Sequence, residues 1–396
     1  MPKSGTRIPG MKLPGITWLR RLHRWIALAI MLPLLLEGAS GTILVAAHMI
    51  DSWRAPVLSQ PAGLHSNPAP ILAAASRQNA EGLRPSRYVA AAGLRPAVVD
   101  FVRPGARQAS LRVWVDPASL AVLARVRDPG AAMAIVRQLH ESLLLPMNPG
   151  RSLIGWFGMG LVLLVVTGVP IWLPPRGRRL SGFRVARTAR GARLMRELHG
   201  AVAIWLMLPL FFQAFSGVTL AFPVTTRSLL GLPQIQRGMP HGARANAQDD
   251  GAPDLAAILS RLEAALPGTD LAELRLPSDG RGLVMARMRR SGAAFDAPLA
   301  VAMVMPDGSR IVSLDDPSRR PASAFLGWLR ALHTATFGGP VWNAVQILAG
   351  LALPLLAITG GTLWLLRRIR RSRQRARAVP RIADAIPPLS LCEDAP

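Results

Sequence analysis

A long apolar segment that begins with Leu-His occurs twice in this chain. Residues 22–44 and 198–220 align without gaps and share the Leu-His start, a Met-Leu-Pro-Leu run and a Ser-Gly pair. Two more Leu-His pairs, at 139–140 and 332–333, precede two further apolar segments, which end in TGVPIWLPPR and TGGTLWLLRR. The chain is therefore predicted to be a tandem duplication in which one Leu-His pair introduces each of four apolar segments.

These four segments predict an integral membrane protein. Half of the 396 residues are hydrophobic, and each segment is long enough to cross a bilayer as a helix, which takes about 20 apolar residues. We expect a membrane all-α four-helix bundle. The predicted helices cover 18–47, 139–173, 198–222 and 332–366. The second and fourth ranges include a short segment that precedes the helix.

The formal net charge is +25, and many of the arginines gather beside the ends of the predicted helices. Eight lie in 176–196 and eight in 367–381. Dense basic residues flank the cytoplasmic ends of membrane helices, so we expect both termini inside the cell. The cytoplasmic parts are then a leader (1–17), an Arg-rich loop (174–197) and an Arg-rich tail (367–396). This placement argues against a nucleic-acid partner, which would need a basic stripe on one surface.

The two long connections, 48–138 and 223–331, are expected on the outer side of the membrane as two small α+β regions. In the first, SLRVWVD (110–116) and AVLARVR (121–127) alternate apolar and polar residues, which predicts a β-hairpin. The second repeats this plan, with a helix predicted at 254–268, hairpins at 273–288 and 299–316, and a flexible loop at 233–253.

The single cysteine is Cys392. One thiol cannot form a disulfide within the chain, and the lack of a Cys-x-x-Cys-His motif excludes a covalently attached c-type haem. The sequence also has no Gly-x-Gly-x-x-Gly after a predicted strand and no P-loop. A nicotinamide or flavin would therefore have to be carried by another protein.

Four of the seven histidines are those of the Leu-His pairs. With both termini inside, His23 and His199 lie at the cytoplasmic ends of their helices, and His140 and His333 lie on the outer side. Neutral imidazole is a good ligand for haem iron, and two imidazoles from facing helices can hold a b-type haem without covalent bonds. We therefore expect up to two bis-histidine haem b groups, with one histidine pair holding each.

Two other interpretations of these histidines stay open at this stage. A histidine at a helix end is often an interfacial residue with an apolar body and a polar tip, although four in duplicated register favour ligands. A bare metal-ion site would need a closer cluster of ligands. His48 has no counterpart at the equivalent Val224 and is interpreted as interfacial or as an alternative ligand, and His65 and His241 are assigned no role.

Charged and small residues near these histidines have candidate roles of their own. Arg20 and Arg24 flank His23, and Arg196 flanks His199; beside their effect on topology, they would suit the carboxylates of haem propionates. Glu37 is the one acid inside the four apolar segments, so it is a candidate for a proton or quinol role, or for an interhelical hydrogen bond. Four pairs of small residues are interpreted as helix packing contacts: Ser40-Gly41, Thr167-Gly168, Ser216-Gly217 and Thr359-Gly360.

Five stretches of the chain together resemble the PepSY-associated transmembrane family. They are LHRWIALAIMLPLLLEGASG, LHESLLLPMNPGRSLIGWFGMGLVLLVVTG, RELHGAVAIWLMLPLFFQAFSG, LHTATFGGPVWNAVQILAGLALPLLAITG and VWVDPASLAVLARVRD. The family comprises iron-regulated proteins of the bacterial inner membrane, among them periplasmic siderophore reductases. The resemblance implies four spans, periplasmic PepSY-like regions, haem carried by the span-associated histidines and, in the reductase branch, electron delivery to ferric siderophores.

The residues and the resemblance lead to one expected function and two alternatives. The expected function is that of a multi-pass inner-membrane oxidoreductase with haem. It would pass electrons from membrane quinol or a separate cytoplasmic reductase to a ferric siderophore or other ferric chelate in the periplasm. No protein nucleophile or general acid is required, so no catalytic residue is assigned. The alternatives are a non-redox PepSY-type membrane module that binds or regulates a periplasmic partner, and a transporter subunit.

Overall fold

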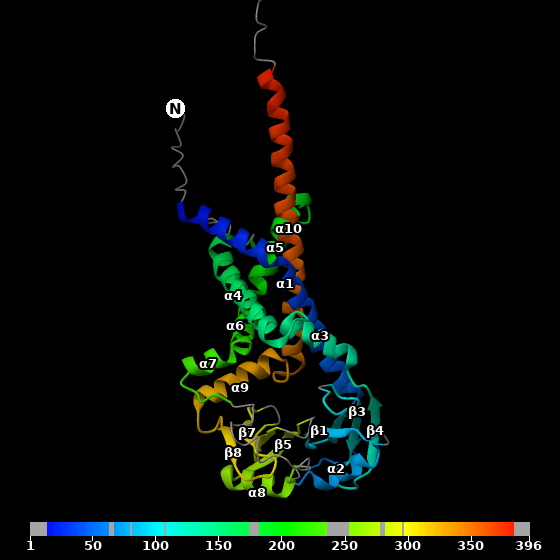
Figure 1. Ribbon diagram of the computed structural model, residues 1–396. Helices are drawn as coiled ribbons and strands as arrows, with labels where there is room; N and C mark the ends of the chain where they lie inside the picture. The colour runs from blue at the N-terminus through cyan, green and yellow to red at the C-terminus, as the bar shows by residue number, and fades with distance from the viewer. Residues whose placement is uncertain are drawn as a thin grey trace, which may run out of the picture. The chain divides into compact units, whose positions relative to one another are not determined.

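The computed structural model describes most of the chain as two compact units (Figure 1). The helical unit consists of Met1–Ala39, Met159–Phe212 and Leu348–Pro396, and the sheet unit consists of Ser40–Gly158 and Gln213–Ile347. Each unit takes segments from both halves of the duplication. The described residues are 14–62, 67–79, 81–106, 108–173, 182–235, 253–277, 282–294 and 297–383.

Several predictions fall outside these described residues. They concern most of the leader, the part of the Arg-rich loop at 174–181, most of the loop at 233–253, the end of the tail with Cys392, and the two loop histidines, His65 and His241.

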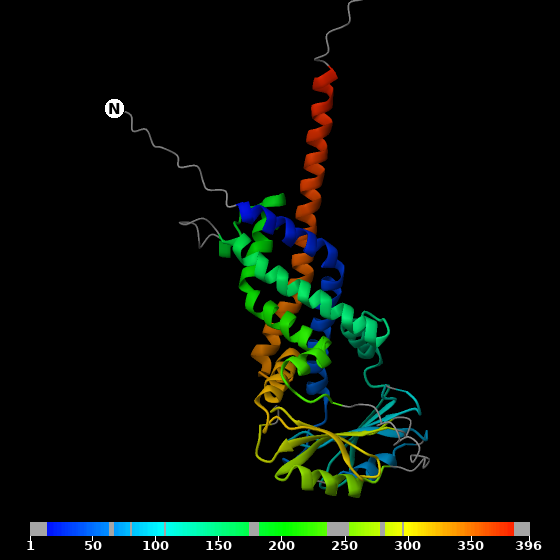
Figure 2. The ribbon, with the colours of Figure 1, turned by 60° about the vertical axis from the view of Figure 1, so that its left-hand side comes forward.

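Among the described residues, three helices are long and apolar enough to cross a membrane, namely α1 (Pro14–Arg54), α4 (Met147–Trp172) and α10 (Gly339–Ala383). A fourth candidate span consists of α5 (Gly191–Trp205) and α6 (Met207–Ala221), which are bent by 66° at the break between them. The expected four-helix bundle is therefore wrong for the third predicted helix, which is broken into α5 and α6. The chain instead combines membrane helices, one of them broken, with a β-sheet (Figure 2).

The break between α5 and α6 has a local cause. Proline has no backbone N–H, and its ring clashes with the carbonyl four residues earlier. Pro209 therefore cannot form the helical hydrogen bond to the Trp205 carbonyl, and its ring disfavours a regular helix at that point. The Trp205 side chain is held in place, because its Nε1 donates to the Phe183 carbonyl (3.1 Å) and its ring packs edge-on against Phe183. The equivalent Pro33 lies inside the unbroken α1, where Ala29 occupies the position of Trp205.

Both α1 and α10 are longer than predicted. The first extends past both ends of the expected 18–47, and the second continues through the arginine cluster instead of ending at residue 366. Arginine has a high helix propensity, so the helix need not end where the apolar residues end.

Short helices precede two of the long ones in the sheet unit. These are α3 (Ala131–Ser142), before α4, and α9 (Pro321–His333), before α10. The chain reverses after α3 at Leu143 and Leu144, which have positive φ values of 53° and 62°. Pro149 and Gly150 lie in the first turn of α4, where proline costs no hydrogen bond. A further short helix, α7 (Pro223–Leu229), follows α6.

The two predicted α+β regions form a single eight-stranded sheet, in the order β4-β3-β2-β1-β5-β6-β7-β8, with antiparallel neighbours throughout. The two predicted regions are joined, because β1 of the first pairs with β5 of the second. All three predicted hairpins are present, as β3–β4, β5–β6 and β7–β8. The strands are β1 (Arg84–Val89), β2 (Ala97–Val102), β3 (Leu111–Val115), β4 (Val122–Arg127), β5 (Thr269–Arg275), β6 (Val284–Arg290), β7 (Ala300–Val304) and β8 (Ile311–Asp315).

One face of the sheet is covered by α2 (Ala69–Ser76) and α8 (Leu255–Ala265), as Figure 1 shows. Alternate strand residues point to this face and form the core of the sheet unit with both helices. The alternation leaves polar residues on the other face. The largest side chains of the core that are fully buried include Tyr88, Phe101, Val113, Ile258, Leu262, Leu274 and Val284.

Candidate functional site

Each of the four Leu-His histidines is held by a hydroxyl of its own repeat. In the sheet unit, the Nδ1 of His140 lies 3.1 Å from Ser40 Oγ, and the Nδ1 of His333 lies 2.8 Å from Ser216 Oγ. In the helical unit, His23 Nδ1 lies 2.9 Å from Thr167 Oγ1 and His199 Nδ1 lies 3.0 Å from Thr359 Oγ1. The duplication therefore repeats a side-chain contact as well as a sequence pattern.

The hydroxyls also define which ring nitrogen carries the proton. Thr167 Oγ1 donates to the Leu163 carbonyl (2.6 Å), and Thr359 Oγ1 donates to the Leu355 carbonyl (2.8 Å). A hydroxyl has one hydrogen, so a threonine that donates it to this carbonyl accepts the hydrogen bond from Nδ1–H of its histidine. The Nε2 atoms of His23 and His199 are then unprotonated, and their lone pairs can bind a metal ion.

The same reasoning applies to one histidine of the sheet unit. Ser216 Oγ donates to the Gln213 carbonyl (3.2 Å), so it accepts from His333 Nδ1–H. Burial, with a smaller effect of the neighbouring His140, lowers the pKa of His333 to about 3. The His333 ring is therefore neutral at physiological pH, which is the form that binds a metal ion.

A glycine follows each of these hydroxyl residues, and the imidazole lies against that glycine. A Cβ added at Gly41 would be 3.0 Å from His140 Cε1, and one at Gly360 would be 3.3 Å from His199 Cε1. The equivalent distances at Gly168 and Gly217, to His23 and His333 respectively, are both 3.4 Å. The Ser-Gly and Thr-Gly pairs, interpreted from the sequence as helix packing contacts, thus position the histidine rings. Their occurrence at four equivalent places was the signal that could have revealed this.

The structure brings His140 and His333 together. Their ring centres are 6.4 Å apart, and the ring planes are inclined by 44°. A nitrogen ligand lies about 2 Å from a bound metal ion, and roughly 1 Å from the centre of its own ring, so two imidazoles on opposite sides of one metal ion have ring centres about 6 Å apart. The spacing of His140 and His333 therefore fits two imidazole ligands of one metal ion.

His23 and His199 are also neighbours, because they interact electrostatically. Each pair takes one histidine from each half of the duplication. Among the residues that the structure describes, no three side chains of His, Cys, Asp or Glu gather as they would around a bare metal ion.

A family model described as the PepSY-associated TM region matches residues 20–367. The chain belongs to this family. The PepSY-associated protein is also similar to PA4219, an uncharacterized protein of Pseudomonas aeruginosa. The two are 29% identical over 289 residues, which are 64% of this chain and 68% of the relative. Family membership and the apolar helices together make this a membrane protein.

Three arginines of this PepSY-associated protein were expected near the helical-unit pair. Arg20 and Arg196 are exposed, whereas Arg24 is half-buried beside the Trp25 ring. The Nε of Arg24 is buried and has no hydrogen-bond partner among the described residues. A buried guanidinium nitrogen without a partner is costly, so an anionic group bound there would be stabilised.

Two further sequence candidates lie on α1. Glu37 is half-buried, and its proton or quinol role stays a prediction. His48 interacts electrostatically with Arg95, Asp51 and Arg137. Arg137 precedes His140 by three residues on α3, so His48 lies near the sheet-unit pair without belonging to it.

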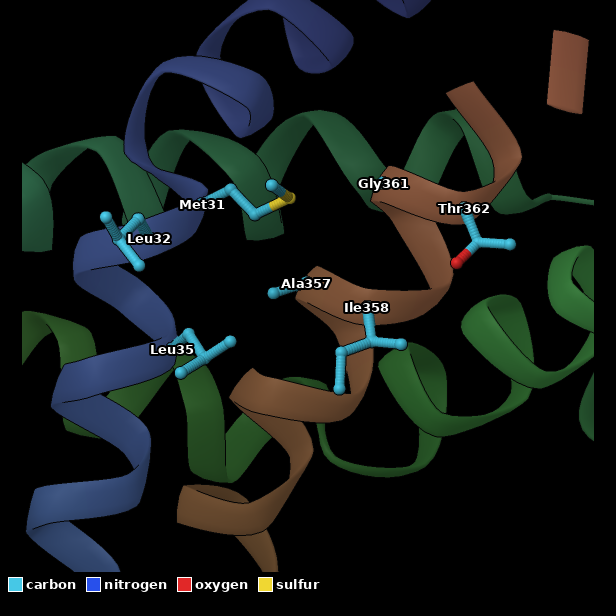
Figure 3. A pocket seen from close by; sticks show the side chains of 7 residues that line it. All are labelled: Met31, Leu32, Leu35, Ala357, Ile358, Gly361 and Thr362. Carbon is cyan, nitrogen blue, oxygen red and sulfur yellow. The ribbon is translucent and has the colours of Figure 1, made fainter. Parts of the chain in front are cut away.

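A pocket of ≈ 270 Å³ lies between α1 and α10 in the helical unit (Figure 3). Leu32 and Ile358 at its wall are 64% and 57% exposed. Such an apolar, open pocket on membrane helices suits contact with lipid chains and has no ionisable side chain in its lining. Its lining is Met31, Leu32, Leu35, Ala357, Ile358, Gly361 and Thr362.

Proposed function

We propose that this protein is a haem-containing, multi-pass electron-transfer protein of the bacterial inner membrane that reduces a ferric chelate, such as a ferric siderophore, on the periplasmic side. The observation that carries the proposal is the 6.4 Å spacing of the His140 and His333 rings. Ser216 leaves Nε2 of His333 free to bind iron, and Ser40 holds His140 at the equivalent place.

Each histidine pair would hold one haem b. His140 and His333 would hold the haem in the sheet unit, and His23 and His199 would hold the one in the helical unit. Haem b supplies one-electron redox chemistry at neutral pH. The chain itself orients the four rings through its hydroxyls and sets the tautomer of His23, His199 and His333, and Arg24 offers a cation for a propionate.

The arginine clusters support an orientation with both termini in the cytoplasm. His140 and His333 then lie on the periplasmic side. Each ferric ion takes up one electron and becomes ferrous, and ferrous iron is held less tightly by the hard oxygen ligands of a chelate. Membrane quinol, or a separate cytoplasmic reductase, would supply the electrons, because the chain carries no nicotinamide- or flavin-binding motif.

The test is to count haem in purified full-length protein from haem-replete cells, by absorption of the oxidised and reduced forms. We expect two haems per chain with the sharp reduced bands of bis-imidazole coordination. His140→Ala or His333→Ala should remove one, and His23→Ala or His199→Ala the other. His48→Ala is the matched control on α1 and should keep both.

Protein without haem, or four single variants that all keep the full complement, would contradict the ligand assignment. A protein without haem would favour the alternative function, a non-redox membrane module whose sheet binds a periplasmic partner.

A further inference from the structure

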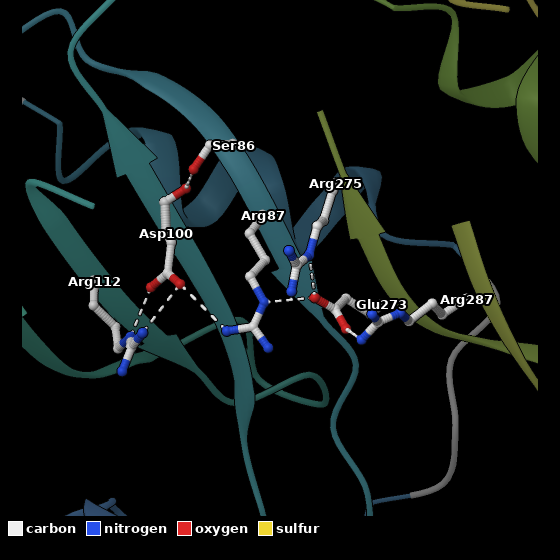
Figure 4. A network of polar contacts seen from close by, with 7 residues as sticks. All are labelled: Ser86, Arg87, Asp100, Arg112, Glu273, Arg275 and Arg287. Atoms are coloured by element: carbon white, nitrogen blue, oxygen red, sulfur yellow. Dashed lines mark hydrogen bonds and ion pairs between the residues drawn. The ribbon is translucent and has the colours of Figure 1, made fainter. Parts of the chain in front are cut away.

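The face of the sheet opposite the core carries a network of charges at its centre (Figure 4). We call this network the charged face: Arg87, Asp100, Arg112, Glu273, Arg275 and Arg287. Each half of the duplication contributes one cross-strand pair of opposite charges. In the first half the cation comes first in the chain (Arg87, facing Asp100), whereas in the second half the anion comes first (Glu273, facing Arg287). This inversion allows Arg87 Nε to bond Glu273 Oε1 at 2.7 Å across the β1–β5 junction.

The two carboxylates are buried beneath the guanidinium groups. The side chains of Asp100 and Glu273 are only 7% exposed. The guanidinium side chains of the same network are 25% to 47% exposed, with Arg275 the most exposed and Arg287 the least. A molecule that approaches this face from solvent therefore meets guanidinium groups rather than carboxylates.

The carboxylates hold these groups in position without neutralising them. Arg112 makes bonds of 2.6 and 3.1 Å to Asp100, and Arg275 and Arg287 bond the two oxygens of Glu273 at 2.7 and 2.8 Å. Four guanidinium groups surround two carboxylates, which leaves an excess of two positive charges. A guanidinium has five N–H donors. Arg275 bonds Glu273 through its Nε, and its side chain is the most exposed of the four, so a ligand can reach its guanidinium group.

The charged face is connected to the sheet-unit histidine pair by a chain of charged neighbours. Arg112 interacts electrostatically with Asp51 of α1. Asp51 and Arg137 both interact with His48, and Arg137 lies one turn before His140 on α3. All of these residues belong to the sheet unit.

We propose that the charged face binds the anionic groups of the ferric chelate, and so selects polycarboxylate or other anionic chelates over cationic ones. The proposal rests on the proposed function for the identity of the ligand. Guanidinium groups bind carboxylates through paired, charge-assisted hydrogen bonds. The buried carboxylates of Asp100 and Glu273 hold the guanidinium groups in position before the ligand arrives, which lowers the entropic cost of binding.

The test uses gallium(III) citrate, because gallium(III) resembles ferric iron in size and charge but is not reduced under these conditions. Binding to the full-length protein in lipid nanodiscs is measured by titration calorimetry at two salt concentrations. We expect binding that weakens as salt rises. Arg275→Gln should weaken it by about tenfold, as expected for the loss of a charge-assisted hydrogen bond. The cationic gallium(III) complex of desferrioxamine B should bind at least tenfold more weakly than the citrate complex.

Two variants control this experiment. Arg261→Gln removes the same charge from α8, on the other side of the sheet, and should leave binding unchanged. Arg275→Lys keeps the positive charge but loses the paired N–H donors of the guanidinium, and it should bind more tightly than Arg275→Gln. Thermal unfolding of each variant checks that the sheet is intact. Equal binding by folded Arg275→Gln and by the parent protein, or equal binding of both gallium complexes, would overturn the proposal. The haem spectrum of the same samples reports separately on the proposed function.

Discussion

A hydroxyl that accepts a hydrogen bond from Nδ1–H fixes the tautomer of a histidine as well as its position. Thr359 holds His199 in this way, and its own hydrogen goes to the Leu355 carbonyl. We expect Thr359→Val, which keeps the shape of the side chain but removes the hydroxyl, to weaken haem binding at the helical-unit pair by about tenfold or more. Thr359→Ser should retain it. Haem retention during dilution and the electron paramagnetic resonance spectrum of the oxidised protein would measure the change.

The matched control for this substitution lies on the same helix. Thr362→Val makes the same chemical change at the apolar pocket between α1 and α10, away from the imidazoles. It should leave haem retention and the spectrum as they are in the parent protein. If Thr359→Val and Thr362→Val behave alike, the hydroxyl of Thr359 does not position His199.

The histidine pairs themselves were predictable from the sequence, whereas their hydroxyl partners were not. A Leu-His pair before each of four apolar segments stands out in a duplicated chain, and it identified His140 and His333 as a pair before their 6.4 Å spacing was known. Ser40-Gly41 and Thr359-Gly360 look like ordinary small residues in membrane helices. Which side chain packs against a small residue depends on the rotation of two helices, and the sequence does not contain that angle.

Among the elements, local pairings were predicted correctly and long-range pairings were not. The β3–β4 hairpin follows from alternation on both sides of a turn, which is a property of one short stretch. The β1–β5 pairing, with Tyr88 opposite Leu274, joins strands from different halves of the chain. Hydrophobic alternation predicts a strand but does not show which other strand it pairs with. The break at Leu206 was missed for a similar reason, because the equivalent Pro33 leaves α1 unbroken.

At the β1–β5 junction, Glu273 makes the stability of the sheet depend on pH. Burial alone would raise the pKa of Glu273, but the guanidinium groups of Arg87, Arg287 and Arg275 outweigh it and lower the pKa to about 2. A carboxyl whose pKa is lower in the folded state than its ordinary value of 4.5 stabilises the fold above that value. The stabilisation, about 3 kcal/mol, is lost as the pH falls from about 5 to 2.

Acid unfolding of the full-length protein, followed by tryptophan fluorescence in nanodiscs, would measure this dependence. We expect Glu273→Gln to be less stable than the parent protein at pH 7 and to lose much less stability between pH 5 and pH 2. Asp307→Asn is the control, because Asp307 also has a lowered pKa, owing mainly to its hydrogen bonds with Ser309, but it is largely exposed in a turn. A Glu273→Gln curve parallel to that of the parent protein would show that the charged face does not contribute to acid stability.

For the whole molecule, the duplication has a consequence for the two histidine pairs. Each repeat gives one histidine to the helical unit and one to the sheet unit, so the units carry similar pairs in different surroundings. The helical-unit pair lies among arginine-rich helix ends, and the sheet-unit pair lies in the same unit as the charged face. In the proposed function this difference gives the protein a direction, with electrons entering at one pair and leaving at the other.

That direction requires a defined orientation in the membrane, which fusions to a reporter of location would test. The arginine clusters at 176–196 and 367–381 predict that both flank cytoplasmic helix ends. Fusions of a cytoplasmically active reporter after Arg187 and Arg375 should therefore be active. Fusions of a reporter that works only after export should be active near Ser119, in the β3–β4 turn, and near Ala256, at the start of α8. An exported signal at Arg187 would place the arginine-rich loop outside, and with it His23 and His199. The sheet would then face the cytoplasm, where a periplasmic ferric chelate could not reach the charged face.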